Sequence, residues 1–232
     1  MKLVYQGKTK DVYHTTNDHV VLKFKDDVTG ADGKFDPGAD SVGLKMEGAG
    51  KSGLQMTTYF FEQLAQKRIP THFIDSDLTE TTMTVKAAEM FGEGLEVICR
   101  YRAVGSFYRR YHSICEKGQS LDGFVEVTLK DDEAGDPPIS DDGLEVLGVL
   151  SKTDYKQMKQ LTKEISSLVK EELAAKQLEL YDIKLEFGRD AETKEMMLID
   201  EISGGNMRVY DANGEYVEPL QLTTYFLDNH SN

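Results

Sequence analysis

The sequence has no tryptophan, two cysteines and only five prolines among 232 residues. Two cysteines are too few for a disulfide framework, and Cys99 and Cys115 lack the spacing of metal ligands. The histidines are scattered without a metal-binding pair, which argues against a zinc site. No run approaches about 18 apolar residues, and the N-terminus lacks the apolar stretch of a signal peptide. We therefore expect a cytoplasmic protein without a membrane segment.

Basic residues are also scarce, because 27 Lys and Arg stand against 41 Asp and Glu and give a net charge of −14. This excess of acid disfavours nucleic acid or an anionic membrane as the main partner. An anionic ligand would need a local concentration of the few basic side chains. The 39% hydrophobic and 29% charged residues are globular values, and the length suits one large domain or two small ones.

Two alternating runs, Tyr181–Gly188 and Met196–Ser203, lie on either side of a polar break at Arg189–Lys194. This pattern predicts a β-hairpin whose first strand ends near Gly188. Ile183, Leu185 and Phe187 would share the face that packs into the core.

Asp182, Lys184 and Glu186 fall on the opposite face of the same strand, across from an acidic pair at Asp200 and Glu201. Such a face is either solvated, with ion pairs across the strands, or surrounds a cation and an anionic substrate. Mg²⁺ prefers one or two carboxylates plus phosphate oxygens as ligands, and Glu186 and Asp200 could supply the carboxylates. The pattern leaves both interpretations open.

Periodicity predicts further elements along the chain. Strands are expected at 2–5, 20–25, 71–74, 82–88, 95–104 and 125–129, and helices at 54–67, 107–111, 153–176 and 218–227. The segment 26–53 is rich in Gly and Asp and predicts a long loop. A Gly-rich linker near Gly92 and Gly94 is the best candidate for a lobe boundary.

Two short stretches could contact phosphate. The turn at Gly7-Lys8 could bring backbone N–H groups and a lysine to a nucleotide, although a plain hairpin turn has the same pattern. Arg100, Arg102 and Ser106 before a short helix could cradle a phosphate, or the arginines could pair with nearby acids.

Gly50-Lys51-Ser52 is similar to the end of a Walker A loop. That loop requires a glycine five positions before Gly50, where Lys45 stands, and no buried strand precedes the segment. We therefore reject a P-loop.

Taken together, the ordered motifs resemble the SAICAR synthetase family of purine-biosynthesis ligases. The resemblance covers most of the chain and rests on Gly7–Tyr13, Asp26–Lys34, Ile69–Phe73, Arg100–Ser106, Lys130–Pro137, Asp182–Gly188 and Asp200–Ser203.

The resemblance implies a two-lobed α+β or α/β fold, with an antiparallel β-rich lobe over a larger α/β lobe and ATP in a cleft like that of ATP-grasp enzymes and kinases. The lobes would be residues 1–91, which bind the nucleotide, and residues 92–232, which carry the metal and ribotide site. The implied reaction joins a carboxyaminoimidazole ribotide to L-aspartate through an acyl phosphate, with ATP as co-substrate and Mg²⁺ as cofactor. We also expect a homo-oligomer.

The resemblance also implies roles for individual residues. The ATP-binding residues would be Gly7, Lys8, Lys10, Val12, Lys86, Met90 and Glu186. The metal ligands would be Glu186 and Asp200. The substrate-binding residues would be Asp32, Arg100, Ser106, Asp182 and Arg208, and the catalytic residues Lys10, Lys184 and Asp200.

Two segments depart from the family pattern. The segment 35–53 is longer than in the family, and residues 50–56 lack the family's asparagine pair. Ser203-Gly204-Gly205 replaces the family's Ser-Pro-Asp sequence. Two alternatives stay open for this reason. One is a paralogous ligase with a different acid or amine, and the other is a nucleotide-binding regulatory protein without catalysis.

Overall fold

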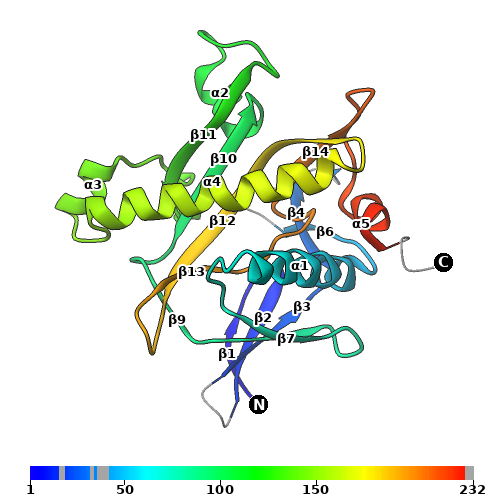
Figure 1. The fold of residues 1–232 in the computed structure, drawn as a ribbon, viewed down its shortest axis with the longest axis vertical. Helices are drawn as coiled ribbons and strands as arrows, with labels where there is room; N and C mark the ends of the chain where they lie inside the picture. The colour runs from blue at the N-terminus through cyan, green and yellow to red at the C-terminus, as the bar shows by residue number, and fades with distance from the viewer. Residues whose placement is uncertain (16–18, 32–33, 36–41, 228–232) are drawn as a thin grey trace. The chain divides into compact units, whose positions relative to one another are not determined.

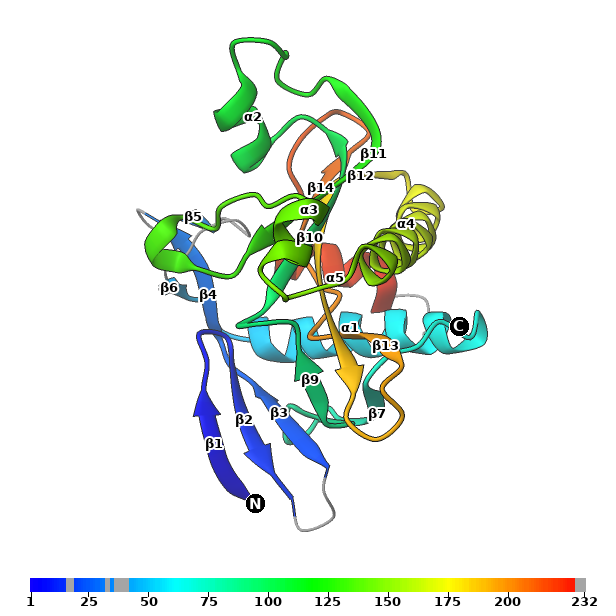
Figure 2. The same cartoon turned by 90° about the vertical axis from the view of Figure 1, so that its left-hand side faces the viewer.

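The computed structural model describes residues 1–15, 19–31, 34–35 and 42–227. The chain divides into two compact units (Figures 1 and 2). The first unit comprises Met1–Glu89, Arg189–Asn206 and Val217–Asn232, and the second comprises Met90–Gly188 and Met207–Tyr216. The predicted domain division after residue 91 stays a prediction, but two C-terminal segments belong with the N-terminal part of the chain.

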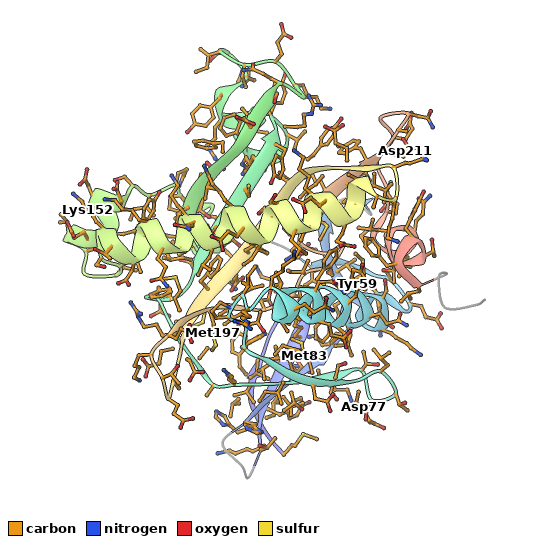
Figure 3. All side chains as sticks on the ribbon, in the orientation of Figure 1. Tyr59, Asp77, Met83, Lys152, Met197 and Asp211 are labelled. Carbon is orange, nitrogen blue, oxygen red and sulfur yellow. The ribbon has the colours of Figure 1, made fainter. Side chains whose placement is uncertain are left out.

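The first unit contains a five-stranded antiparallel sheet in the order β1-β2-β3-β8-β7. Its strands are β1 (Lys2–Gln6), β2 (Lys10–His14), β3 (Val20–Phe24), β7 (Phe73–Asp77) and β8 (Thr82–Val85). Met83 of β8 is fully buried, as is Met197 of β13 (Met196–Ile199), whereas Asp77 at the end of β7 is exposed (Figure 3).

Helix α1 (Ala49–Gln66) packs against this sheet and against α5 (Pro219–Leu227). The apolar residues that predicted the helix are its buried face: Leu54, Met56, Phe60, Phe61 and Leu64. Phe226 of α5 adds its ring at 5.4 Å from that of Phe60. The aromatic contacts explain why the apolar α5 lies beside α1 (Figure 1).

The prediction of one loop over 26–53 was wrong. This segment contains β4 (Asp27–Ala31), β5 (Lys34–Phe35) and β6 (Val42–Lys45), which form a sheet in the order β5-β4-β6, and α1 begins at Ala49. Short strands in a segment rich in turn-forming Gly and Asp show no clear alternation of apolar residues, so periodicity does not predict them. Gly50 is required because a Cβ there would lie 2.9 Å from the Lys25 carbonyl oxygen.

The second unit is built on the antiparallel strands β11 (Ser120–Leu129), β10 (Leu95–Arg102) and β12 (Leu178–Asp190), and β14 (Met207–Asp211) also pairs with β12. Helix α4 (Lys152–Ala174) confirms the long helix predicted at 153–176 and packs on β10 and β11 (Figure 1). Its buried side includes Met158, Ile165, Val169 and Leu173. The remaining elements are β9 (Ala88–Met90), α2 (Gly105–Tyr111), η1 (Asp132–Ala134) and α3 (Asp141–Val146).

The turn after β12 lies later than predicted, because the strand continues past Gly188 to Asp190. The Asp190 N–H donates to the Glu195 carbonyl at 2.9 Å, and the Lys194 N–H donates to the Asp190 carbonyl at 2.8 Å. The Asp190 carboxylate also accepts the N–H groups of Glu192 and Thr193. The carboxylate therefore stabilises the turn, and Arg189-Asp190 are strand residues.

No helix among the described residues is long and apolar enough to cross a membrane.

Candidate functional site

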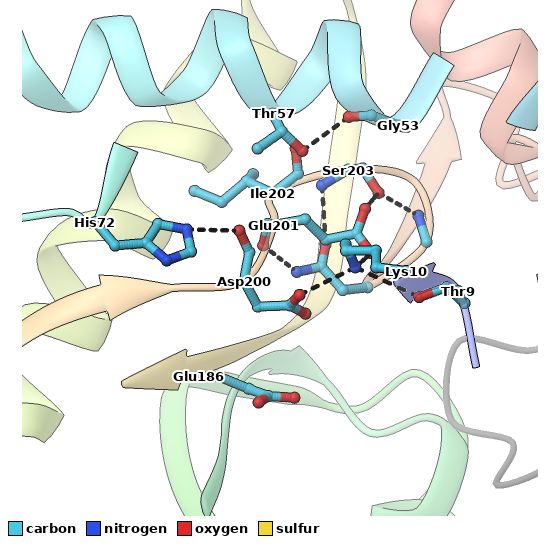
Figure 4. Close-up of polar contacts among 12 residues, drawn as sticks. Thr9, Lys10, Gly53, Thr57, His72, Glu186, Asp200, Glu201, Ile202 and Ser203 are labelled. Carbon is cyan, nitrogen blue, oxygen red and sulfur yellow. Dashed lines mark hydrogen bonds and ion pairs between the residues drawn. The ribbon is translucent and has the colours of Figure 1, made fainter. Parts of the chain in front are cut away.

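In the first unit, a short loop directly after β13 presents two carboxylates, those of Asp200 and Glu201 (Figure 4). Asn206 holds the loop together, because its Nδ2 donates to the Glu201 carbonyl at 2.6 Å and its Oδ1 accepts the Ser203 N–H at 2.9 Å. The Ser203 hydroxyl donates to Glu201 Oε2 at 2.6 Å and accepts the Gly205 N–H at 2.9 Å. The loop is thus fixed by its own side chains.

Lys10, at the start of β2, binds both carboxylates (Figure 4). Its Nζ lies 3.0 Å from Asp200 Oδ1 and donates to Glu201 Oε1 at 2.7 Å. Burial alone would lower the pKa of Lys10, but the charges of Asp200 and Glu201 outweigh burial and raise it. Lys10 is therefore cationic at neutral pH. We call Lys10, Asp200 and Glu201 the Lys10 cluster.

His72 lies beside this loop and is 3% exposed. Its Nε2 is 3.2 Å from the Asp200 carbonyl oxygen (Figure 4). Because a carbonyl only accepts hydrogen bonds, Nε2 must carry the proton. Burial lowers the pKa of His72 to about 4, against the opposing effect of the Asp200 carboxylate.

In the second unit, Arg100 of β10 is the centre of an ion-pair network and is 2% exposed. It donates through Nη1 to Asp182 Oδ2 at 2.8 Å, through Nε to Glu126 Oε1 at 2.7 Å and through Nη2 to Ser106 Oγ at 2.9 Å. Arg208 donates to the same Asp182 oxygen at 2.9 Å. Arg110 donates to Glu126 Oε2 at 2.6 Å. We call Arg100, Arg110, Glu126, Asp182 and Arg208 the Arg100 cluster.

The strand register creates the Arg100 cluster. Arg100 is the direct partner of Asp182 between β10 and β12, and Asp182 is the partner of Arg208 between β12 and β14. Directly opposed strand residues have neighbouring side chains. Gly105 leaves room for Arg208, because a Cβ there would lie 2.8 Å from its Nη1.

Further along the same strands, two acids stand opposite each other. Glu96 and Glu186 are register partners between β10 and β12, an arrangement that is unfavourable unless cations accompany it. Lys184 donates to Glu96 at 2.5 Å, and Lys130 donates to Glu186 at 2.8 Å. Burial would lower the pKa of Lys184, but Glu96 raises it. We call these four residues the Lys184 cluster.

The predicted face of β12 therefore carries ion pairs across the strands and is partly solvated, because the side chains of Lys184 and Lys130 are 32% and 45% exposed. Asp182 and Glu186 are buried, and Asp182, Lys184 and Glu186 each have a partner of opposite charge. The opposite face, Ile183, Leu185 and Phe187, is buried as predicted.

The predicted nucleotide turn lies between β1 and β2. The Gly7 N–H donates to the Lys10 carbonyl at 2.9 Å, and a Cβ on Gly7 would lie 2.5 Å from that oxygen, so only glycine fits. Lys8 at the tip is exposed, and Val12 in β2 is half-buried. Lys25 Nζ donates to the Gly7 carbonyl at 2.7 Å.

The other predicted residues lie in three places. Lys86 follows β8 and donates to Asp190 at 3.1 Å. Met90 at the end of β9 is exposed and belongs to the second unit. Asp32 lies outside the described residues.

The structure thus brings together Lys10 with Asp200 in one unit and Arg100, Ser106, Asp182 and Arg208 in the other. Glu186 belongs to the second unit and Asp200 to the first. Sequence reasoning did not select Glu96, Glu126, Lys130, Glu201 or His72 as site residues. Glu201 had a signal in its place beside Asp200, and His72 and Lys130 lie within motifs of the family resemblance, whereas Glu96 and Glu126 had none.

The oxygen ligands in the Lys10 cluster suit a hard divalent cation. Asp200 leaves 33% of its side chain exposed, and Lys10 already places a cation beside it. Within the described ranges, no three His, Cys, Asp or Glu side chains gather in an arrangement that could hold a metal ion. One or two carboxylates fit Mg²⁺, which retains water and substrate oxygens as its other ligands.

Comparison with known proteins gives a consistent result. The family model described as SAICAR synthetase matches residues 3–222. The phosphoribosylaminoimidazole-succinocarboxamide synthase of Clostridium tetani is 60% identical to this chain over 228 residues, which are 98% of this chain and 100% of that protein.

Solved structures agree. A SAICAR synthetase in complex with ADP superposes with a TM-score of 0.81 at 29% identity, covering 98% of this chain and 91% of that one. The phosphoribosylaminoimidazole-succinocarboxamide synthase of Ehrlichia chaffeensis gives a TM-score of 0.82 at 25% identity, covering 99% and 92%. The predicted α+β fold with antiparallel sheets is confirmed.

Proposed function

This chain belongs to the SAICAR synthetase family, and we propose that it is the ATP-dependent ligase that joins 5-amino-1-(5-phosphoribosyl)imidazole-4-carboxylate to L-aspartate in purine biosynthesis. The products are SAICAR, ADP and phosphate. The observation that carries the proposal is the 60% identity to the Clostridium tetani synthase over the whole of that protein. The similar structure in complex with ADP supports ATP as the co-substrate.

The reaction needs charge neutralisation more than a protein nucleophile. A ribotide carboxylate oxygen attacks the γ-phosphorus of ATP, ADP leaves, and an acyl phosphate results. The aspartate amine then attacks the acyl carbon, phosphate leaves, and the amine loses a proton. Phosphoryl transfer depends mainly on positioning and on the stabilisation of charge.

In the first unit, Lys10 has the right properties for this task. It is buried, cationic and fixed by two carboxylates, so it can present a positive charge to a phosphate without reorganisation. The other nucleotide contacts that we propose from this unit are Gly7 and Lys8 of the turn before β2, Val12 of β2, and Lys86. Met90 and Glu186 are those from the second unit.

Asp200 and Glu186 are the residues that we propose to hold Mg²⁺. The exposed part of Asp200 and its charge fit a hard cation. When bound, Mg²⁺ neutralises phosphate oxygens of ATP. The role of Glu201 is different: it accepts hydrogen bonds from Lys10 and Ser203, and so keeps the Lys10 ammonium beside Asp200.

The Arg100 cluster is the ribotide site that we propose, with Ser106 beside it. Its three guanidinium groups outnumber its two carboxylates, which favours an anion such as the ribotide phosphate. Asp182 fixes Arg100 and Arg208 in place, and Lys184 is the catalytic lysine of this unit. Asp32 remains part of the proposal for the same substrate.

We extend the proposal to a cytoplasmic location and a homo-oligomer. Cys99 and Cys115 are both free thiols, as is usual in a reducing compartment. The negative net charge fits a protein whose partners are small molecules and not nucleic acid or membranes.

A second candidate is a paralogous ligase that takes another amine. The observation that favours it is the Gly204-Gly205 pair, which gives this part of the loop no side chains. Gly204 is also constrained, because a Cβ there would lie 2.6 Å from Pro219 Cα.

The test is ADP release by the purified chain with Mg-ATP, the ribotide and a panel of amines, omitting each component in turn. Release that requires both the ribotide and L-aspartate is the expected result. Release with the ribotide and another amine would favour the paralogous ligase. Nucleotide binding without any turnover would contradict both.

A further inference from the structure

The Asp200 backbone has an unusual conformation, which needs stabilising contacts from neighbouring residues. Its φ is +66°, in the left-handed region that residues other than glycine seldom adopt. Asn206 fixes the next peptide by donating to the Glu201 carbonyl, but Asn206 belongs to the same loop. Two contacts from outside the loop reach other atoms, because Lys10 binds the two carboxylates and the Thr57 hydroxyl donates to the Ile202 carbonyl at 3.4 Å. A contact to the Asp200 backbone itself would set the direction of the turn.

That contact comes from a segment 128 residues earlier in the chain. Residues 70–72 lie parallel to β13: the Leu198 N–H donates to the Pro70 carbonyl at 2.9 Å, and the His72 N–H donates to the Leu198 carbonyl at 3.0 Å. This register places His72 beside the end of β13. Its Nε2–H then reaches the Asp200 carbonyl, so the bond spans the point where the strand becomes the loop (Figure 4).

The imidazole itself has little freedom. His72 is buried, and its ring lies edge-on to that of Phe61 in α1 at 5.8 Å. The backbone hydrogen bond to β13 fixes the Cα, and α1 fixes the ring plane. A rigid donor therefore defines where the Asp200 carbonyl lies, and with it the direction in which the Asp200 carboxylate leaves the backbone.

We infer that His72 is a positioning residue, whose Nε2–H fixes the left-handed turn at Asp200 and so directs the Asp200 carboxylate toward Lys10 and the metal–nucleotide. The inference rests on the proposed function, because it gives Asp200 the metal role. Removing a hydrogen bond that orients a metal-binding group typically lowers metal affinity or activity about 10- to 100-fold.

Three substitutions separate the donor from the packing. His72→Gln places an amide N–H near the position of Nε2, whereas His72→Met has a similar length and no donor. His72→Asn keeps an amide, but its nitrogen reaches only about as far as Nδ1. His112→Met is the matched control for the change of residue type, because His112 is exposed in the second unit.

The first readout does not require turnover: Mn²⁺ binding to the chain with ATP, measured by electron paramagnetic resonance. We expect about tenfold weaker Mn²⁺ binding in His72→Met and His72→Asn, with affinity largely restored in His72→Gln. If the unmodified chain released no ADP with ribotide and aspartate, the proposed function would fail, but this comparison would still be readable.

The second readout is the division between kcat and KM. We expect kcat to fall in the Met and Asn variants while the KM for the ribotide stays unchanged, because the proposed ribotide contacts belong to the Arg100 cluster. Equal losses in the Gln and Met variants would mean that ring packing matters and the donor does not. Full activity and Mn²⁺ affinity in the Met variant, or loss of cooperative unfolding in all three variants, would likewise overturn the inference.

Discussion

The Lys10 cluster of the first unit and the Arg100 cluster of the second are both buried ion networks, yet they leave opposite formal charges. One lysine faces two carboxylates in the first, which leaves −1. Three guanidinium groups face two carboxylates in the second, which leaves +1. Burying such groups is tolerated only where partners compensate them. The residual charges suit the ligands that we propose, a metal ion with its nucleotide in the first unit and an anionic ribotide in the second.

The chemistry of the cations differs as well. The ammonium of Lys10 is a compact charge with three N–H donors, and it binds two separate carboxylates. The planar guanidinium of Arg100 fixes three groups at once through nitrogens in set directions. The first arrangement suits charge neutralisation during phosphoryl transfer, and the second suits recognition of a shaped anion.

The largest effect is expected from removing the anionic excess of the Lys10 cluster. Asp200→Asn keeps the shape of the side chain but removes its charge, and we expect kcat to fall roughly 100- to 1,000-fold, as it does when one transition-state contact is lost. Ribotide binding, measured calorimetrically, should persist because the Arg100 cluster is untouched. Turnover equal to that of the unmodified chain would remove the metal role of Asp200.

The Arg100 cluster should respond in stability as well as in binding. Arg100→Gln leaves the buried Asp182 and Glu126 with one fewer cation each, and breaking a buried pair typically costs about 3–5 kcal/mol. Arg208 and Arg110 still contact the two acids, so we expect the lower part of that range, measured by urea unfolding. Unchanged stability together with normal ribotide binding would contradict this account of the cluster.

The stability of the two units should respond differently to acid. The guanidinium groups of the Arg100 cluster stay charged at every relevant pH, whereas His72 of the first unit gains a proton. The pKa of His72 falls from 6.5 to about 4 on folding. Between these values the unfolded chain binds a proton that the folded chain does not, so stability decreases as the pH falls through this window. His72 contributes at most about 3–4 kcal/mol to this loss in the free energy of unfolding.

Hydrogen exchange at pH 7 and pH 4.5 measures this difference by region. We expect amides around β13 to lose protection at the lower pH, and His72→Gln to remove that part of the loss. The same pH response in the Gln variant would show that carboxylates, and not His72, cause it.

The local pattern of apolar residues predicted much of the architecture. The 3.6-residue repeat located α4, and the alternation at Ile183, Leu185 and Phe187 identified the core face of β12. These features depend only on neighbours in the sequence. The strands β4–β6 were missed because Gly and Asp dominate their segment, so the local signal pointed to turns.

The partners of the site residues could not be predicted in the same way. Asp182 meets Arg100 only because β10 and β12 pair in one register, and a shift by one residue would turn either side chain to the other face. His72 and Asp200 are 128 positions apart. They meet because residues 70–72 pair with β13 through backbone hydrogen bonds, which the periodicity of the sequence does not predict. Resemblance supplied the residue types, but the contacts that fix them required the structure.

The smallest effect tests whether burial, and not charge pairing itself, sets the importance of these arginines. Arg102 lies two positions after Arg100 on β10 and also binds a carboxylate, Glu179, at 2.7 Å. Its side chain is 36% exposed and that of Glu179 is 44% exposed, so water already satisfies both charges in part. Exposed pairs contribute about 0–1 kcal/mol, and we expect Arg102→Gln to lower the free energy of unfolding by less than about 1 kcal/mol. A loss as large as that of Arg100→Gln under the same urea titration would mean that burial does not explain the difference between the two arginines.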